Sequence, residues 1–171
     1  MEYRRLGKSG VSVSEIALGS WFWAGKQRDE SDAVAIHLRA RELGVNFFDT
    51  ADVYEQGVAE SFVGKALQSM NRDEVVIATK CRGNMGNGPT MQGLSKKHII
   101  AACNASLKRL GTDFIDLYQF HWTDPSVRIE ESLTAIGCLL RQGKILYWGI
   151  SNYSADRKST RLNSRHGKLS R

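Results

Sequence analysis

The feature that most constrains this chain is a regular alternation of short apolar runs with longer segments of helical periodicity. After an N-terminal stretch, each apolar run is followed by a segment whose apolar residues recur at helical spacing, and a last apolar run closes the series. Parallel strands need helical crossovers of this kind, so the alternation predicts an α/β fold with a parallel sheet. The expected strands cover residues 16–19, 45–48, 75–79, 114–120 and 145–150.

The ends and faces of the helices can also be predicted. Ser95 suits an N-cap, with Leu94 and Ile99 spaced as a hydrophobic staple across it, and Gly44 suits a C-terminal stop. Before the first strand, residues 3–16 predict a hairpin that turns near Ser9-Gly10. The residues expected to face the core are Ala33, Ile36, Ala40 and Leu43, then Val63, Leu67 and Met70, then Ile99, Cys103, Leu107 and Leu110, and finally Ile129, Leu133, Ile136 and Leu140.

Polar side chains follow consecutive strands at the point where each strand ends. Asp49 ends the second expected strand, Lys80 the third and His121 the fourth, while Ser151 and Asn152 follow the fifth. The carboxyl ends of parallel strands meet at one edge of a sheet, where ligands bind in barrels and in doubly wound folds. We therefore expect these side chains to gather at one site.

The loop after the first strand separates these two architectures. A doubly wound sheet is expected to carry a phosphate-binding loop there, but residues 19–25, GSWFWAG, match neither GxGxxG nor a P-loop. The prediction is therefore a partial (β/α)₈ TIM barrel, with an N-terminal hairpin and about five of the eight strands.

The residues at this edge suit the reduction of a carbonyl group. That reaction needs a hydride donor and a proton donor for the forming alkoxide. A phenol has a pKa of about 10, and a neighbouring cation makes it a better proton donor near neutrality. Tyr54, five residues after Asp49, could be this donor, with Lys80 as the cation and Asp49 holding Lys80 charged. His121 could donate a hydrogen bond to the substrate oxygen or relay the proton.

Each of these residues also has a purely structural interpretation. Asp49 could cap a loop, Lys80 could be a solvated strand end, and His121 could be a core histidine. Ser151-Asn152 suits the grip of a carboxamide but is also an ordinary turn pair. The joint placement on one rim favours a functional site. Trp21 and Trp122 could line an apolar substrate pocket, or they could only cover the mouth of the barrel. The remaining histidines, His37, His98 and His166, are expected to be structural or to face solvent.

Composition excludes several classes of protein. No apolar run reaches the roughly 18 residues that cross a bilayer, and the N-terminus lacks a signal-peptide core, so neither membrane insertion nor secretion is expected. Three widely separated cysteines predict neither a disulfide framework nor a zinc site, which favours a cytoplasmic protein. The net charge of +6 belongs to residues 157–171, because the preceding residues carry equal numbers of acids and bases. We therefore expect no nucleic-acid partner.

Several motifs together resemble the aldo-keto reductase family. They are FFDTADVY at 47–54, VVIATK at 75–80, LYQFHWTDP at 117–125 and YWGISNYS at 147–154, after YRRLGKSGVSVSEIALGS at 3–20. The resemblance implies reduction of aldehyde or ketone carbonyls to alcohols by hydride transfer from NADPH. It implies that Tyr54 donates the proton, that Lys80 and Asp49 tune it, and that His121 orients the carbonyl. Ser151 and Asn152 would hold the nicotinamide, with Asp49 near its ribose.

Two stretches favour one branch of that family. Residues 49–60, DTADVYEQGVAE, and 93–110, GLSKKHIIAACNASLKRL, resemble the branch that contains voltage-gated potassium channel beta subunits and their bacterial relatives. The alternative function is therefore a cofactor-binding accessory subunit with an oligomeric or channel-like partner. Channel beta subunits often carry another residue where this chain has His121, which favours a catalytic relative.

A third hypothesis comes from a different class of enzyme. A metal-dependent barrel hydrolase could use Asp49, Asp52 and His121. Such sites usually need paired histidines at the end of the first strand, and residues 18–21, LGSW, contain none. We therefore expect no metal.

The resemblance divides the chain in two. Residues 1–155 are expected to form an incomplete, N-terminal part of the family's barrel. Residues 156–171 are expected to be a basic tail outside the family pattern, either disordered or an artefact of the sequence, with a nucleic-acid-binding tail as the competing interpretation.

The resemblance also predicts how this chain binds cofactor. The family's loops that grip the pyrophosphate and the 2′-phosphate follow later strands, so we expect weak NADPH binding, little turnover and poor stability. Fluorescence titration of the purified protein with NADPH measures this directly. Tight, saturable binding by a soluble monomer would contradict it.

Overall fold

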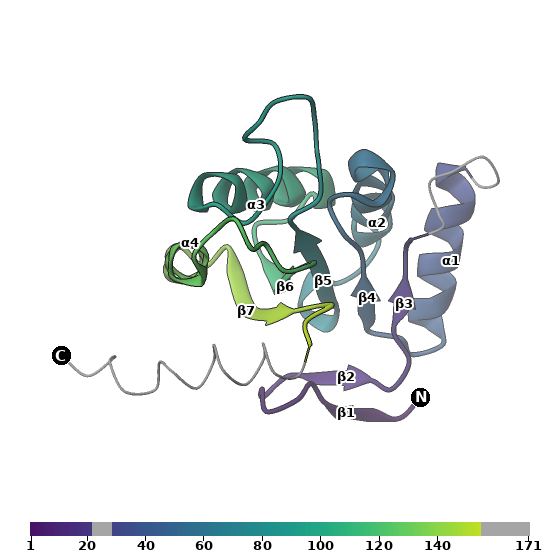
Figure 1. Ribbon diagram of the computed structural model, residues 1–171. Helices are drawn as coiled ribbons and strands as arrows, with labels where there is room; N and C mark the ends of the chain where they lie inside the picture. Colours follow the sequence, from purple (N-terminus) through teal and green to yellow (C-terminus); the bar gives the residue numbers. More distant parts are fainter. Residues whose placement is uncertain (22–28, 155–171) are drawn as a thin grey trace.

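The computed structural model describes residues 1–21 and 29–154 (Figure 1). Residues 22–25 of the loop after the first strand, and the expected basic tail at 156–171, lie outside the described residues. The elements are β1 Tyr3–Arg5, β2 Ser12–Ser14, β3 Leu18–Gly19, α1 Glu30–Glu42, β4 Phe47–Asp49, a 3₁₀ turn Tyr54–Gly57, α2 Val58–Leu67, a 3₁₀ turn Arg72–Glu74, β5 Val76–Cys81, α3 Lys96–Leu110, β6 Ile115–Phe120, α4 Ile129–Arg141 and β7 Ile145–Ile150.

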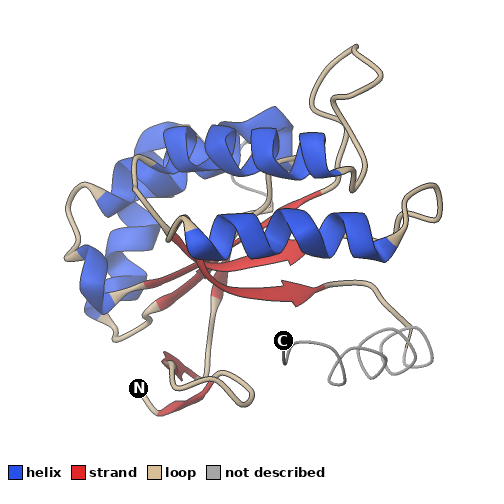
Figure 2. Cartoon of the chain, turned by 90° about the vertical axis from the view of Figure 1, so that its left-hand side faces the viewer, coloured by secondary structure: helices blue, strands red, loops and turns tan. Residues whose placement is uncertain are grey.

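The main sheet is parallel, and its strand order follows the chain: β3-β4-β5-β6-β7. A doubly wound sheet reverses its strand order at one point, whereas a barrel does not. All four helices cover one face of this sheet (Figure 2). Both observations confirm the predicted α/β class and the partial-barrel arrangement.

None of the helices in the described ranges is long and apolar enough to cross a membrane.

The core fills the layer between the sheet and the helices. Every residue of β5 is buried, which fits an interior strand of a parallel sheet covered by helices. Burying a large apolar side chain contributes about 1.5–3 kcal/mol, so this layer is the main source of stability. Its largest fully buried side chains include Phe48, Ile77, Ile99, Leu110, Ile115, Tyr118, Phe120 and Leu139.

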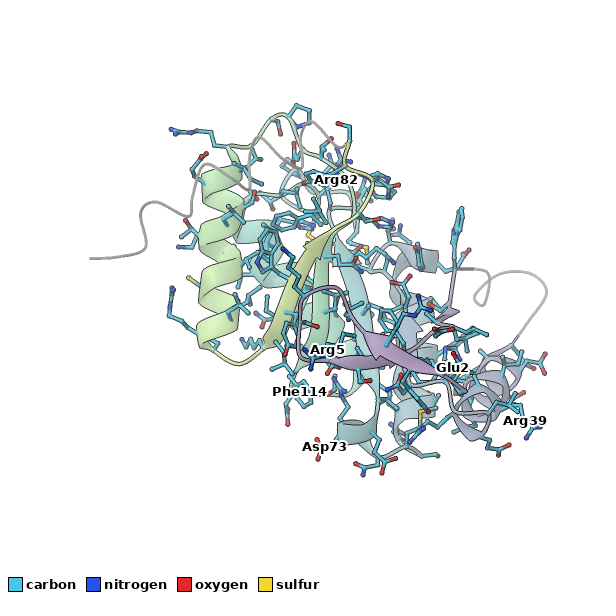
Figure 3. All side chains as sticks on the ribbon, turned by 90° about the horizontal axis from the view of Figure 1, so that it is seen from below. Glu2, Arg5, Arg39, Asp73, Arg82 and Phe114 are labelled. Atoms are coloured by element: carbon cyan, nitrogen blue, oxygen red, sulfur yellow. The ribbon has the colours of Figure 1, made fainter. Side chains whose placement is uncertain are left out.

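The hairpin of β1 and β2 sits at the N-terminal end of the barrel strands. Asn46, just before β4, accepts a hydrogen bond from Ser14 N at 2.7 Å and donates one to Ser12 O at 3.1 Å. Figure 3 shows Asp73 and Phe114, which precede β5 and β6, far from Arg82, which follows β5. The hairpin therefore closes the bottom of the sheet and leaves the C-terminal edge free for the site.

The helix ends follow the sequence signals. Ser95 caps α3, and its hydroxyl accepts a hydrogen bond from His98 N at 3.2 Å. Leu94 and Ile99 are both buried beside this cap, as the staple predicted. Gly44 follows α1 with a φ of +91°, a left-handed conformation that ends the helix.

Three details of the core prediction are wrong. Ile16 is 62% exposed, because the paired part of the first strand is only Leu18–Gly19. Leu43 is 56% exposed, because α1 ends before it and buries Ala33 and His37 instead. In α4 the buried residue is Leu139, not Leu140, which is 37% exposed. Positions three and four residues beyond Ile136 both lie near its face, so periodicity alone cannot choose between them.

The packing of α2 on α3 gives a stability prediction. A methyl group at Gly64 would lie 2.4 Å from the backbone oxygen of Arg109 and 2.9 Å from the backbone of Leu110. We expect Gly64→Ala to lower the free energy of unfolding by about 1–3 kcal/mol, because backbone must shift. In the interior of α4, a methyl group at Gly137 would meet only the end of the Arg141 side chain, at 3.5 Å. Gly137→Ala should therefore raise the free energy of unfolding by about 0.5–1 kcal/mol. Urea unfolding measures both, and equal effects would contradict the packing.

Candidate active site

The site lies at the C-terminal edge of the sheet. Asp49 is the last residue of β4, and Lys80 is the penultimate residue of β5, one position deeper than its predicted place past the strand end. His121 follows β6, and Ser151 and Asn152 follow β7. The register that pairs these parallel strands thus brings residues from four separate segments to one rim.

The ammonium group of Lys80 holds the centre of the site. Its Nζ donates hydrogen bonds to Asp49 Oδ2 at 2.6 Å and to Thr50 O at 2.8 Å, and lies 3.4 Å from the hydroxyl of Tyr54. The Lys80 side chain is only 8% exposed. A charged group this deeply buried needs an opposite charge and further hydrogen bonds, and these three oxygens supply them.

Tyr54 is presented by an unusual turn. Glu55, Gln56 and Gly57 have φ values of 47°, 53° and 93°, so three successive residues are left-handed. This conformation is uncommon for residues other than glycine and is often found at functional sites. Gln56 fastens the turn through a hydrogen bond from Nε2 to Asn84 O at 3.1 Å. The turn directs the Tyr54 hydroxyl toward Lys80.

His121 is buried beside Tyr54 and is uncharged at neutral pH. Its ring lies 5.6 Å from the Tyr54 ring in an edge arrangement and stacks on Trp122 at 3.7 Å. Burial, and then the charge of Lys80, lower the pKa of His121 to about 4. Its Nδ1 is inaccessible and has no hydrogen-bond partner among the described residues. The nitrogen available to a substrate is therefore Nε2.

Ser151 and Asn152 tie the end of β7 to the end of β6. Ser151 N donates to Phe120 O at 2.8 Å, and Asn152 Nδ2 donates to His121 O at 2.9 Å and to Ser151 Oγ at 3.1 Å. Asn152 is left-handed, with a φ of 56°. With its amide nitrogen bonded in this way, the oxygen of the Asn152 side chain is the atom that can accept from a ligand.

All the predicted site residues line one cavity of about 650 Å³. Trp21 stacks on Tyr54, with ring centroids 6.1 Å apart, and Trp122 stacks on His121. Each tryptophan therefore lies beside one of the two aromatic rings of the proposed chemistry. The volume is within the range of small-molecule sites. The lining residues are Trp21, Asp49, Val53, Tyr54, Glu55, Gln56, Lys80, His121, Trp122, Ser151 and Asn152.

Sequence reasoning missed three of these lining residues: Val53, Glu55 and Gln56. They reach the cavity because of the left-handed turn, and Gly57 is the one residue in it that signals such a conformation. Asp52, weighed as a metal ligand, is fully buried and does not line the cavity. Within residues 1–21 and 29–154, no three His, Cys, Asp or Glu side chains are placed to hold a metal ion.

The environment of His121 gives a titration prediction. The imidazole should stay neutral until the pH falls to about 4. Lys80→Met removes the second cause of this shift and should raise the pKa of His121, although it should stay below 6.5 because burial, the larger cause, remains. Lys65→Met, on the exposed side of α2, is the control and should change nothing. NMR titration of the ring measures this, and a wild-type midpoint near the ordinary histidine value would refute it.

The chain is similar to known proteins over most of its length. The model of the aldo/keto reductase family matches residues 15–169. A probable voltage-gated potassium channel subunit beta from Arabidopsis thaliana is 43% identical over 157 residues, which are 91% of this chain and 48% of that protein. The aldo-keto reductase YhdN of Bacillus subtilis is 37% identical over 166 residues, 94% of this chain and 50% of that protein.

A solved structure agrees with both. The holo form of aldo-keto reductase AKR11C1 from Bacillus halodurans superposes with a TM-score of 0.84 at 39% identity, covering 95% of this chain and 54% of that one. The chain therefore spans about half the length of the relatives it matches. The resemblance drawn from the motifs is confirmed: this chain belongs to the aldo/keto reductase family.

Proposed function

We propose that this protein is an NADPH-dependent oxidoreductase that reduces aldehyde or ketone carbonyl groups to alcohols, with Tyr54 as the proton donor. The observation that supports this most directly is the contact of Lys80 Nζ with both Asp49 Oδ2 and the Tyr54 hydroxyl inside one cavity. An acid, an ammonium and a phenol in contact form a proton donor with its own charge stabilisation.

Tyr54 transfers its proton to the oxygen of the carbonyl group as that oxygen gains electrons. The phenolate left behind is stabilised by the ammonium of Lys80, which lies 3.4 Å away. Asp49 balances the charge of Lys80 and fixes its direction through the 2.6 Å ion pair. A general acid placed in this way contributes about 10²–10⁴-fold to the rate.

His121 orients the substrate rather than supplying the proton. Because its pKa is lowered to about 4, the imidazole is neutral at neutral pH and does not compete with Tyr54 as the acid. His121 lines the cavity, and its Nε2 donates a hydrogen bond to the carbonyl oxygen when the proton resides on that nitrogen. Trp21 and Trp122 form apolar walls for the rest of the substrate.

The residues at the end of β7 suit a nicotinamide cofactor. When bound, NADPH supplies the hydride. Ser151 offers a hydroxyl and Asn152 a free amide oxygen on the cavity wall, a pair that matches the donors and acceptors of a carboxamide. Asp49 lies on the same wall and suits a ribose hydroxyl. NADPH in preference to NADH, and a cytoplasmic location, are part of the proposal through the family resemblance.

A second candidate is a cofactor-binding accessory subunit of a potassium channel. The observation that favours it is the 43% identity to the Arabidopsis thaliana protein named as a channel beta subunit. In that role the same cavity binds the cofactor, and a channel-like partner or a second subunit binds elsewhere on the protein. The two candidates differ in whether proton transfer from Tyr54 is needed.

Tyr54→Phe separates the two candidates. In a protein that carries this chain within a complete barrel, it should reduce the rate of NADPH oxidation with a panel of aldehydes by at least about a hundredfold, because the proton donor is lost. Tyr147→Phe removes the hydroxyl of an exposed tyrosine on β7 and is the matched control, which should keep wild-type activity. Fluorescence titration should show that both variants keep the wild-type affinity for NADPH. Full activity of Tyr54→Phe would overturn the proposed role, and partner capture without any reduction would favour the accessory subunit.

A further inference from the structure

Asp52 is a buried acid that the proposed chemistry does not use. It is fully buried two residues before Tyr54, and neither carboxyl oxygen has a hydrogen-bond partner among the described residues. An unpaired carboxylate inside a protein costs several kcal/mol, so a group in this position keeps its proton or finds a partner.

Arg109, the cation whose charge acts on Asp52, is already committed to another acid. Arg109, on α3, donates from Nε to Glu60 Oε2 at 2.6 Å, and Thr79, on β5, donates to Glu60 Oε1 at 2.6 Å. Arg109 also reaches Ser106 Oγ at 3.3 Å. Both oxygens of Glu60 are thus bonded, and Arg109 pairs with Glu60 rather than with Asp52.

The other groups that face Asp52 favour its neutral form. Burial, and then the charge of Glu60, raise the pKa of Asp52 to about 7. Arg109 and the backbone N–H groups of Val53 and Arg82 act in the opposite direction, although neither N–H reaches hydrogen-bond geometry. From the sheet, Cys81 and Tyr118 face the same cluster, and burial raises the pKa of each, so both are neutral.

Asp52 belongs to the segment that carries Tyr54. Residues 50–54 are fastened to β5 by hydrogen bonds from Thr50 N to Ala78 O at 2.9 Å and from Asp52 N to Lys80 O at 3.0 Å. The segment is also tightly packed, since a methyl group at Gly83 would lie 2.5 Å from Val53. Water cannot reach the Asp52 carboxyl group unless this segment moves away from β5.

We propose that Asp52 is a positioning residue whose uncharged, buried carboxyl group keeps residues 50–57 seated on β5, with the Tyr54 hydroxyl beside Lys80. When the segment opens, Asp52 becomes solvated and loses its proton. The effect of this opening on catalysis, through the position of Tyr54, rests on the proposed reductase function. The opening itself does not depend on that function.

The sign of the pH dependence follows from linkage. An acid that ionises near its ordinary value of 3.8 in the open segment and at about 7 in the closed one releases a proton on opening between these values. The closed segment is therefore held most firmly in acid, and it loosens as the pH rises toward 7. Above that pH, opening releases no further proton and the dependence levels off.

Amide hydrogen exchange of the whole chain tests this without cofactor or substrate. After correction for intrinsic exchange, the opening constant reported by the Asp52 and Tyr54 amides should rise by about tenfold per pH unit between about pH 5 and pH 7. The amide of Arg141, in the last turn of α4, opens by local fraying that does not expose Asp52, so it is the internal reference and should not share this slope. A flat profile at Asp52 and Tyr54 would overturn the proposal.

Two variants assign the slope to Asp52. Asp52→Asn should abolish it, whereas Asp113→Asn, at an exposed acid between α3 and β6, should keep it. Glu60→Gln removes the neighbouring charge and frees Arg109, so the pKa of Asp52 should fall and the slope should end at a lower pH. This second variant keeps the test decisive if Asp52→Asn does not fold. A slope that persists unchanged in the Asp52 or Glu60 variant would assign it to another group and refute the proposal. If the pH slope is confirmed but the protein reduces no carbonyl compound, the proposed reductase function is overturned and the role of Asp52 in holding the segment is not.

Discussion

The site depends on the burial of one charge. The side chain of Lys80 rises from an interior strand and is only 8% exposed, so its ammonium is satisfied mainly by groups of the protein. Its partners come from the end of β4, from the backbone of the next segment and from the 3₁₀ turn beyond it. Satisfying this charge therefore fixes the ends of two strands and the turn that presents Tyr54.

The same charge shapes the chemistry of its neighbours. It contributes to keeping His121 neutral, and it offers Tyr54 a cation at the place where a phenolate would form. Two groups that can both donate a proton are thereby given different roles by a single lysine. In the layer between the sheet and the helices, a single cation again separates two similar groups. Arg109 pairs with Glu60, and Asp52, which has no such partner, has a raised pKa.

Much of the fold and of the candidate site could be predicted from the sequence. The alternation of strands and helices predicted the parallel sheet, and polar residues after successive strands predicted which side chains would meet. The reason is physical: strand ends in a parallel sheet share an edge whatever their sequence separation. The left-handed turn at Glu55 and Gln56 could not be predicted, because neither residue type favours that conformation and tertiary contacts impose it. The burial of Asp52 was missed for a related reason, since only packing reveals that Arg109 is committed to Glu60.

The strand order has a consequence for how this protein acquires its structure. Within the main sheet, each strand after β3 pairs with the strand before it along the chain, as Ile77 of β5 does with Phe48 of β4. Each pairing closes a loop only as long as one helical crossover, so it loses less chain entropy than a pairing between distant strands would. A sheet of this kind can grow one strand at a time during synthesis on the ribosome, with each new strand and helix docking on a surface that is already ordered.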